Sequence, residues 1–201
     1  DISIHHNFIS HCSDVGIGVG GTNVPGVYDV DVSFNEVFDM DLNEHTFGGG
    51  SNVHYGMTQE SGQNTTFAFN KVHNVEFYLI LANYAENSGY SIITGNVFWD
   101  ANPTSDNYTV KLRTVNGVVI FSNNIVDSNT ASSYALVVGS TATYPNDNTI
   151  IANNIFTGVG GVYLSEGNNT SIQGNTFLGT GQGIWITSGA GRTFVNGNLF
   201  P

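Results

Sequence analysis

A short phrase centred on asparagine returns eight times along the chain and constrains the fold more than any other feature. Its clearest copy spans residues 170–177, TSIQGNTF. The asparagines are Asn7, Asn35, Asn70, Asn96, Asn124, Asn154, Asn175 and Asn198, at spacings of 28, 35, 26, 28, 30, 21 and 23 residues. Self-similarity at a period of roughly 20–50 residues is the signature of a repeat architecture in which stacked units bury a shared core.

The residues that flank each asparagine are apolar at two fixed positions. Three places before it stand Ile4, Val32, Phe67, Ile93, Phe121, Ile151, Ile172 and Val195, and two places after it stand Ile9, Val37, Val72, Phe98, Val126, Phe156, Phe177 and Phe200. In a chain with 40% hydrophobic residues, chance rarely fills every one of these positions. The residue just before the asparagine is Gly or Asn in five copies, which favours a sharp bend. Each phrase therefore predicts a strand, a tight turn and a second strand.

A further strand follows in most repeats. We predict it at residues 16–19, 77–81, 108–112, 134–138, 161–164 and 183–186, whereas repeat two has no clean equivalent. No sustained period of 3.6 residues with helix caps is present. The sequence thus predicts one all-β domain over residues 1–201, a parallel β-helix of about eight coils with an Asn ladder and Phe, Ile and Val stacks. An antiparallel sandwich or barrel would need two-residue hairpin signals, and a column of like residues argues against it.

The pattern of an apolar residue, two spacers, Asn, one spacer and a second apolar residue resembles the right-handed parallel β-helix of pectate-lyase-like proteins. The resemblance covers nearly the whole chain. That superfamily includes polysaccharide lyases, glycoside hydrolases, uronan epimerases, phage tailspikes, adhesins and copper-delivery proteins. The resemblance therefore implies the fold and leaves the activity open.

Composition excludes some classes of function. Four Lys and Arg stand against sixteen Asp and Glu, a net charge of −12, which disfavours nucleic acid and anionic membranes as partners. No apolar stretch is long enough to span a bilayer, and Cys12, the single cysteine, excludes an internal disulfide. Abundant Gly, Asn, Thr and Ser with few Lys favours a secreted or cell-surface, extracellular protein.

The repeat is most stretched between Asn35 and Asn70, where we predict a long loop insertion at residues 39–64. All six histidines lie in the first 73 residues and ten of the sixteen acids in the first 76. Function in solenoids concentrates where loops depart from the repeat. We therefore expect any chemistry to lie in the first half of the chain.

Acidic residues in this region are the first candidates for catalysis. Stacking would bring loops of successive coils together, and a glycosidase needs two carboxyl groups roughly 5–9 Å apart. The candidates are Asp39, Asp41, Glu44, Glu60 and Glu76. The alternatives are a solvated acidic loop or a site in which the same oxygens bind Ca²⁺. No zinc-type His or Cys spacing is present, so the sequence leaves any metal site undetermined.

Lys111 and Arg113 give a second mechanism. They are two residues apart and share one face of a predicted strand. The resemblance to β-helix lyases implies that one of them abstracts the C5 proton of a uronate while cations neutralise the carboxylate. Ordinary surface charge is the alternative.

Aromatic and histidine residues give a candidate binding surface for sugars. Exposed rings stack on sugar faces while their polar tips form hydrogen bonds. The substrate-binding candidates are His45, His54, Tyr55, Tyr78, Trp99 and Tyr108, with Tyr134, Tyr163 and Trp185 also expected to be exposed. The alternative is that these rings cover neighbouring coils.

The sequence is compatible with two functions. The first is an extracellular carbohydrate-active β-helix that hydrolyses or eliminates a polysaccharide. The second is a non-catalytic rod such as an adhesin, a tailspike-like stalk or a surface-filament subunit. Because strands at the ends of a β-helix are unpaired, we also expect end-to-end self-association or further coils of a longer chain.

Overall fold

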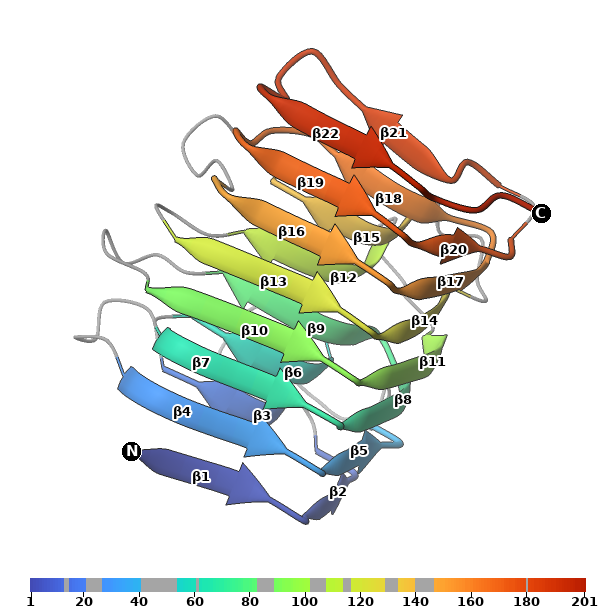
Figure 1. Ribbon diagram of the computed structural model, residues 1–201. Helices are drawn as coiled ribbons and strands as arrows, with labels where there is room; N and C mark the ends of the chain where they lie inside the picture. The colour runs from blue at the N-terminus through green and yellow to red at the C-terminus, as the bar shows by residue number, and fades with distance from the viewer. Residues whose placement is uncertain are drawn as a thin grey trace, which may run out of the picture.

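The protein forms a coil of short strands arranged in three parallel sheets (Figure 1). The computed structural model describes residues 1–12, 15–20, 27–40, 54–60, 62–82, 89–101, 108–113, 117–128, 134–139, 147–179 and 181–201. Within these ranges every element is a strand. No helix in the described part of the chain is long and apolar enough to cross a membrane.

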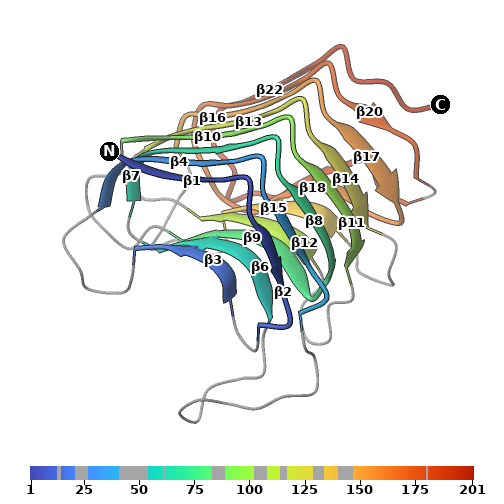
Figure 2. The ribbon, with the colours of Figure 1, turned by 90° about the horizontal axis from the view of Figure 1, so that it is seen from below.

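Each coil gives one strand to each sheet in turn. Sheet A contains β1 (Ile2–His5), β4 (Val27–Ser33), β7 (Gly62–Ala68), β10 (Tyr90–Thr94), β13 (Val118–Ser122), β16 (Thr149–Ala152), β19 (Thr170–Gln173) and β22 (Thr193–Asn196). Sheet B contains β2 (Phe8–Ser10), β5 (Glu36–Phe38), β8 (Lys71–Val75), β11 (Val97–Ala101), β14 (Ile125–Ser128), β17 (Ile155–Gly158) and β20 (Thr176–Phe177). Sheet C contains β3 (Val15–Val19), β6 (Tyr55–Gln59), β9 (Phe77–Ala82), β12 (Tyr108–Arg113), β15 (Tyr134–Val138), β18 (Gly161–Leu164) and β21 (Ile184–Ile186). Seen from the N-terminal end, sheets A and B meet at a corner and sheet C closes the coil (Figure 2). The predicted right-handed parallel β-helix is confirmed.

Apolar columns fill the interior of the coil. In sheet A the register places Val32, Phe67, Ile93 and Phe121 in line, and all four side chains are fully buried. In sheet B, Phe156 stacks on Phe177 with ring centroids 5.1 Å apart. The two apolar positions of the repeated phrase therefore form the dry core on both sides of the corner.

The asparagine ladder runs along the corner between sheets A and B. Asn96 Nδ2 donates to Asn124 Oδ1 at 3.0 Å and to the Phe67 carbonyl oxygen at 2.9 Å. Asn96 Oδ1 in turn accepts from the backbone N–H of Asn70 at 2.9 Å and from Asn70 Nδ2 at 3.0 Å. Each amide thus satisfies buried backbone groups in its own and adjacent coils.

The residue before each ladder asparagine makes the bend in the left-handed backbone region. The φ angles are 59° at His6, 55° at Phe34, 56° at Phe69, 68° at Gly95, 56° at Asn123, 56° at Asn153, 64° at Gly174 and 62° at Gly197. Gly and Asn tolerate this region, whereas bulky residues disfavour it. The first three coils are therefore unusual in placing His and two Phe residues at this corner.

One prediction about the stretched repeat is wrong. Repeat two does contain a sheet C strand, β6, which lies inside the interval predicted as loop, as does the start of β7 at Gly62. The sequence of β6, YGMTQ, has one hydrophobic core residue, Met57. It pairs with Ile17 of the preceding coil and Leu79 of the following coil. This segment is recognised as a strand by its pairing with β3 and β9, because its own sequence does not alternate between apolar and polar residues.

Candidate functional site

The predicted acidic residues do not form a catalytic pair among the described residues. Glu76 is fully buried, and its Oε2 accepts a hydrogen bond from the backbone N–H of His54 at 3.0 Å. His54 is buried as well, so neither side chain faces a substrate surface. Asp41, Glu44 and His45 lie outside the described residues.

Asp39 and Glu60 follow strands of two different sheets. Asp39 follows β5, where its Oδ1 accepts from Asn74 Nδ2, and Glu60 follows β6. The five residues of β6 span about 16 Å at the usual rise per residue. A glycosidase holds its two carboxyl groups within about 5–9.5 Å. Hydrolysis by Asp39 and Glu60 acting together is therefore not supported.

Tyr78 is a core residue, so its prediction as an exposed sugar-binding ring is wrong. Its ring lies 5.4 Å from that of Phe98, its hydroxyl donates to the Asp127 carbonyl at 2.6 Å, and it accepts from the Ala101 N–H at 2.7 Å. Burial raises the pKa of the Tyr78 phenol far above its ordinary value. Phe77, Tyr78 and Leu79 are all fully buried, so strand alternation fails where the chain bends from sheet B into sheet C.

The remaining aromatic candidates lie on two different sheets. Trp99 is in β11 of sheet B, where it stacks on His73 with centroids 4.1 Å apart. Tyr55 is in β6 of sheet C and packs against Phe77 at 5.5 Å. Tyr108 is in β12, beside Lys111. The structure thus separates the predicted binding residues into a sheet B group and a sheet C group.

The outer face of sheet C holds the densest group of candidate residues. Lys111 Nζ donates to Tyr108 Oη at 3.0 Å and lies 4.6 Å from the centroid of the Tyr108 ring. Arg113 follows on the same strand, and Tyr108, Lys111 and Arg113 are half-buried on either side of the buried Val110 and Leu112. Both cations predicted for this strand therefore share its outer face.

A run of aromatic side chains continues from Lys111 towards the C-terminal coils. Register pairs Lys111 with Val137, Val137 with Tyr163 and Tyr163 with Trp185. Tyr134 stacks on Tyr163 with centroids 4.5 Å apart. An open pocket is lined by Tyr108, Lys111, Tyr134, Val137, Gly139, Tyr163 and Ser165. The sequence predicted that these rings are exposed, but only coil register shows that they gather around Lys111.

The state of the tyrosines in this pocket bears on its chemistry. Partial burial, with a smaller contribution from Tyr163, raises the pKa of the Tyr134 phenol above 10.0. Tyr134 is therefore neutral at physiological pH and acts as a hydrogen-bond donor and a stacking ring.

Residues 42–200 match the family model described as a right handed beta helix region. The chain belongs to this β-helix family. No curated protein matches it significantly. Among solved structures, it is similar to an alginate lyase from Paenibacillus sp. str. FPU-7, with 9% sequence identity, a TM-score of 0.38, and coverage of 98% of this chain and 91% of that chain.

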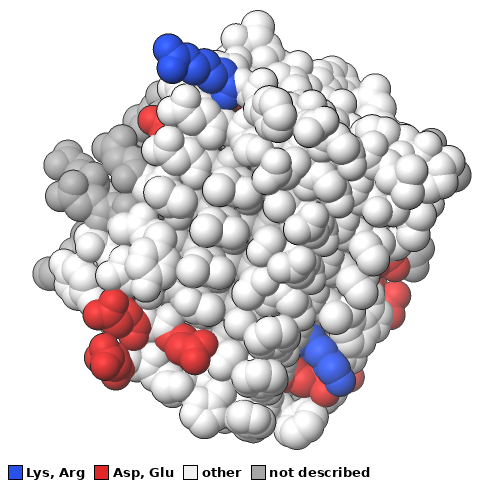
Figure 3. Space-filling view, viewed as in Figure 1, with Lys and Arg blue, Asp and Glu red and all other residues white. Residues whose placement is uncertain are grey.

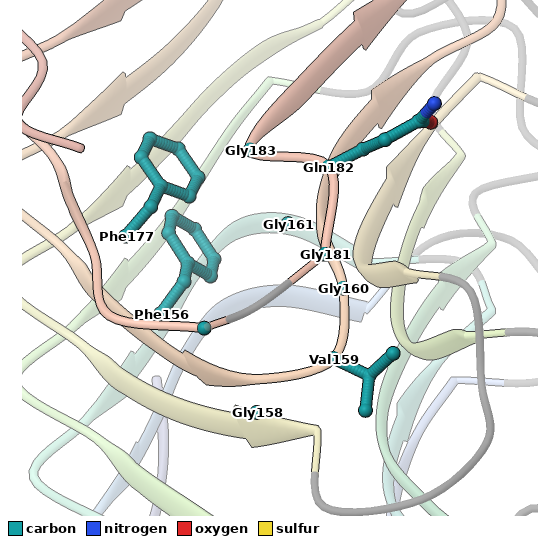
Figure 4. Close-up of a pocket in the computed structure, with 10 residues that line it drawn as sticks. Phe156, Gly158, Val159, Gly160, Gly161, Phe177, Gly181, Gln182 and Gly183 are labelled. Carbon is teal, nitrogen blue, oxygen red and sulfur yellow. The ribbon is translucent and has the colours of Figure 1, made fainter. Parts of the chain in front are cut away.

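A second hollow in this β-helix lies among glycines (Figure 4). Phe156 and Phe177 lie side by side at its edge, while Val159 and Gln182 point away from them. A Cβ on Gly161 would lie 1.9 Å from the Gly183 carbonyl oxygen, so glycine permits successive coils to approach closely here. The lining carries no charged side chain. We assign this hollow to coil packing.

Metal ligands do not gather in the part of the β-helix that the structure describes. No group of three or more His, Cys, Asp or Glu side chains in these ranges is placed to hold a metal ion. The Ca²⁺ alternative rested on the loop that includes Asp41 and Glu44, which lie outside the described residues.

Proposed function

We propose that this β-helix binds a uronate-containing polysaccharide along the outer face of sheet C and cleaves it by β-elimination. The observation that supports the proposal is the hydrogen-bonded pair of Lys111 and Tyr108 at one end of a run of aromatic rings. A polymer substrate of this kind agrees with an extracellular location, which we propose as well.

The aromatic run has the form expected of a surface for a sugar chain. Tyr108, Tyr134, Tyr163 and Trp185 come from four successive strands of sheet C, β12, β15, β18 and β21. At the usual strand spacing these span about 14 Å along the coil axis. Flat rings beside hydroxyl groups suit the mixed apolar and polar faces of pyranose units.

The pair of Lys111 and Tyr108 supplies both proton transfers that β-elimination requires. Lys111, as a neutral amine, takes the C5 proton, and the C5–H electron pair forms the C4=C5 double bond as the C4–O4 bond breaks. The Tyr108 hydroxyl gives its proton to the departing O4 oxygen. The Lys111 ammonium then returns a proton to Tyr108 across their 3.0 Å hydrogen bond. The net result moves one proton from C5 to O4 and consumes no other reagent.

Arg113 has a role in binding the uronate. It lies two residues beyond Lys111 on the same face, with Cα atoms about 7 Å apart at the usual strand rise. A guanidinium matches a carboxylate in bidentate geometry and stabilises the charge that develops at C5. The protein has a net charge of −12, so a cation at this point is needed to hold an anionic polymer.

The test is to incubate the protein with polygalacturonate and with alginate, each with and without EDTA. The formation of unsaturated products is measured by ultraviolet absorbance. We expect activity on one of them, its loss in Lys111→Ala and Lys111→Arg, and a large decrease in Tyr108→Phe. Lys71→Ala, which changes a lysine on sheet B, is the matched control and should retain activity. Absence of product from both polymers, or full activity in Lys111→Ala, would refute the proposal.

A non-catalytic rod is the second candidate, and the surface over sheet A favours it. Figure 3 shows that most of this surface is free of charged side chains, which lie mainly at its margins and over the N-terminal coils. A flat, weakly charged face suits lateral packing or passive adhesion. Polysaccharide binding without any unsaturated product would favour this candidate over the lyase.

A further inference from the structure

A second group of exposed aromatic rings lies at the corner between sheets A and B, away from Lys111. Phe34 and Phe69 are 52% and 55% exposed, although both are large apolar residues. The rings of His6, Phe34 and Phe69 stack along the axis, with successive centroids 5.3 and 5.2 Å apart. They form one continuous ridge, which we call the corner ridge.

The backbone indicates that this ridge is not needed for the bend itself. Phe34 and Phe69 adopt φ angles of 55° and 56°, a region that disfavours bulky side chains, and the last five coils use Gly or Asn at the same position. A Cβ on Gly95 would lie 2.6 Å from the Phe69 ring, so this ring leans over the next coil. Strained residues that persist without a packing need point to function.

A parallel ridge of rings lies on sheet B. Phe38, His73 and Trp99 stack on one another, with centroids 5.3 and 4.1 Å apart. The His73 ring is held in place by Glu36, whose Oε1 lies 3.2 Å from His73 Nε2. We call this row the sheet B ridge.

Charged and polar groups lie between the two ridges. Register aligns Phe8, Glu36 and Lys71 in one column of sheet B. An open pocket here is lined by His6, Asn7, Phe8, Phe34, Asn35, Glu36, Phe69 and Lys71. The lining of this hollow thus combines the rings of the corner ridge and Phe8 with one carboxylate, Glu36, and one ammonium, Lys71, whose formal charges cancel.

We propose that this trough binds a neutral oligosaccharide, with sugar faces stacked on the corner ridge and hydroxyl groups bonded to Glu36 and Lys71. The stacked rings repeat at the coil spacing, which lets successive sugar units find equivalent contacts. Glu36 accepts hydrogen bonds from hydroxyl groups and Lys71 donates to them. The carboxylate also disfavours a uronate chain here, which separates this ligand class from that proposed for sheet C.

The two tryptophans of the chain make the two surfaces separately observable. Trp99 belongs to the sheet B ridge and Trp185 to the aromatic run on sheet C. In a Trp185→Phe background, the fluorescence of Trp99 is titrated with cellohexaose and mannohexaose, with hexagalacturonate as the charged comparison. We expect a saturable change with a neutral hexamer and a weaker one with hexagalacturonate.

Matched variants then test the ridge. The double variant Phe34→Asn and Phe69→Asn removes both rings and introduces the residue that coils five and six already use at this bend. It should weaken binding at Trp99 by at least tenfold and leave unsaturated-product formation unchanged. Lys111→Ala should abolish unsaturated-product formation and leave oligosaccharide binding at Trp99 unchanged. Failure of the binding proposal is therefore distinguishable from failure of the proposed lyase activity, on which it does not depend.

Three outcomes would overturn the proposal. The first is a lack of any Trp99 response to both neutral hexamers, and the second is a response that the double Asn variant leaves unchanged. The third is a decrease in oligomer size in the double variant, measured by light scattering, because the ridge would then be a contact between copies of the chain.

Discussion

Phe67 and Phe69 are two residues apart, and the backbone gives them opposite energetic roles. Phe67 is fully buried in the sheet A column, so Phe67→Ala should lower the free energy of unfolding by about 3–5 kcal/mol. Phe69 is exposed at a φ of 56°. Relief of left-handed strain, about 1–2 kcal/mol, offsets the loss of ring stacking, about 0.5–1.5 kcal/mol, in Phe69→Asn. We expect this variant to stay within about 1 kcal/mol of the parent.

Urea denaturation of both variants measures this contrast. A loss in Phe69→Asn as large as that in Phe67→Ala would mean that the exposed ring supports the fold, and the functional account of the corner ridge would lose its basis.

The buried phenol of Tyr78 predicts a loss of stability at alkaline pH. Its pKa is raised above 10.0 in the folded protein, mainly by burial. The folded state then holds the proton more tightly than the unfolded state, so the stabilisation is fully present below pH 10.0 and is lost as pH rises above it. Tyr134 contributes in the same direction.

Unfolding curves from neutral pH to above pH 10 test this prediction. Tyr78→Phe should be less stable than the parent at neutral pH, because it loses the hydrogen bonds to Asp127 and Ala101, and should show a flatter decline above pH 10. Equal slopes in the two proteins would contradict it.

The asparagine ladder should contribute most to stability in the central coils of the β-helix. Asn96→Ala removes a fully buried amide that joins Asn70, Asn124 and Phe67, and leaves buried donors and an acceptor without partners. Each such group costs about 1–3 kcal/mol, so we expect a loss of about 3 kcal/mol or more. Asn198→Ala should cost clearly less, because Asn198 is only half-buried in the last coil. Thermal or urea unfolding compares the two, and equal losses would show that the ladder acts only locally.

Elements that repeat could be predicted from sequence, and elements defined by their neighbours could not. The phrase fixes a strand on each side of its asparagine, which gave sheets A and B and their core residues directly. The sheet C strand β6 was missed because Met57 takes its register from β3 and β9. Tyr78 was misplaced because Phe77, Tyr78 and Leu79 are all buried at the bend into sheet C, so a ring expected at the surface lies in the core.

The candidate site shows the same division. A spacing of two placed Lys111 and Arg113 on one face of a strand, and the structure has them there. The acidic residues, by contrast, were grouped by closeness in sequence. Glu76 is buried and accepts a hydrogen bond from the His54 N–H, and β6 lies between Asp39 and Glu60 along the chain. Loops in a solenoid meet according to coil register, which sequence distance does not give.

For the molecule as a whole, the last coil leaves core positions uncovered. Val195 continues the column of Ile172 and is 45% exposed, and Phe200 stacks on Phe177 at 4.9 Å and is 55% exposed. Burial of such apolar surface favours association at about 25 cal/mol per Å². We therefore predict that the 201-residue chain self-associates through this end in a concentration-dependent way.

Net charge decides how this association responds to salt. Two molecules that each carry −12 repel one another, and salt screens the repulsion because the Debye length falls from about 10 Å at 0.1 M to about 3 Å at 1 M. Sedimentation equilibrium should therefore show stronger association at high salt. Val195→Asn combined with Phe200→Asn should weaken it at every salt concentration, whereas the corner-ridge double variant should not. Association that weakens with salt would instead indicate ion pairs between copies, and the apolar end would not be the contact.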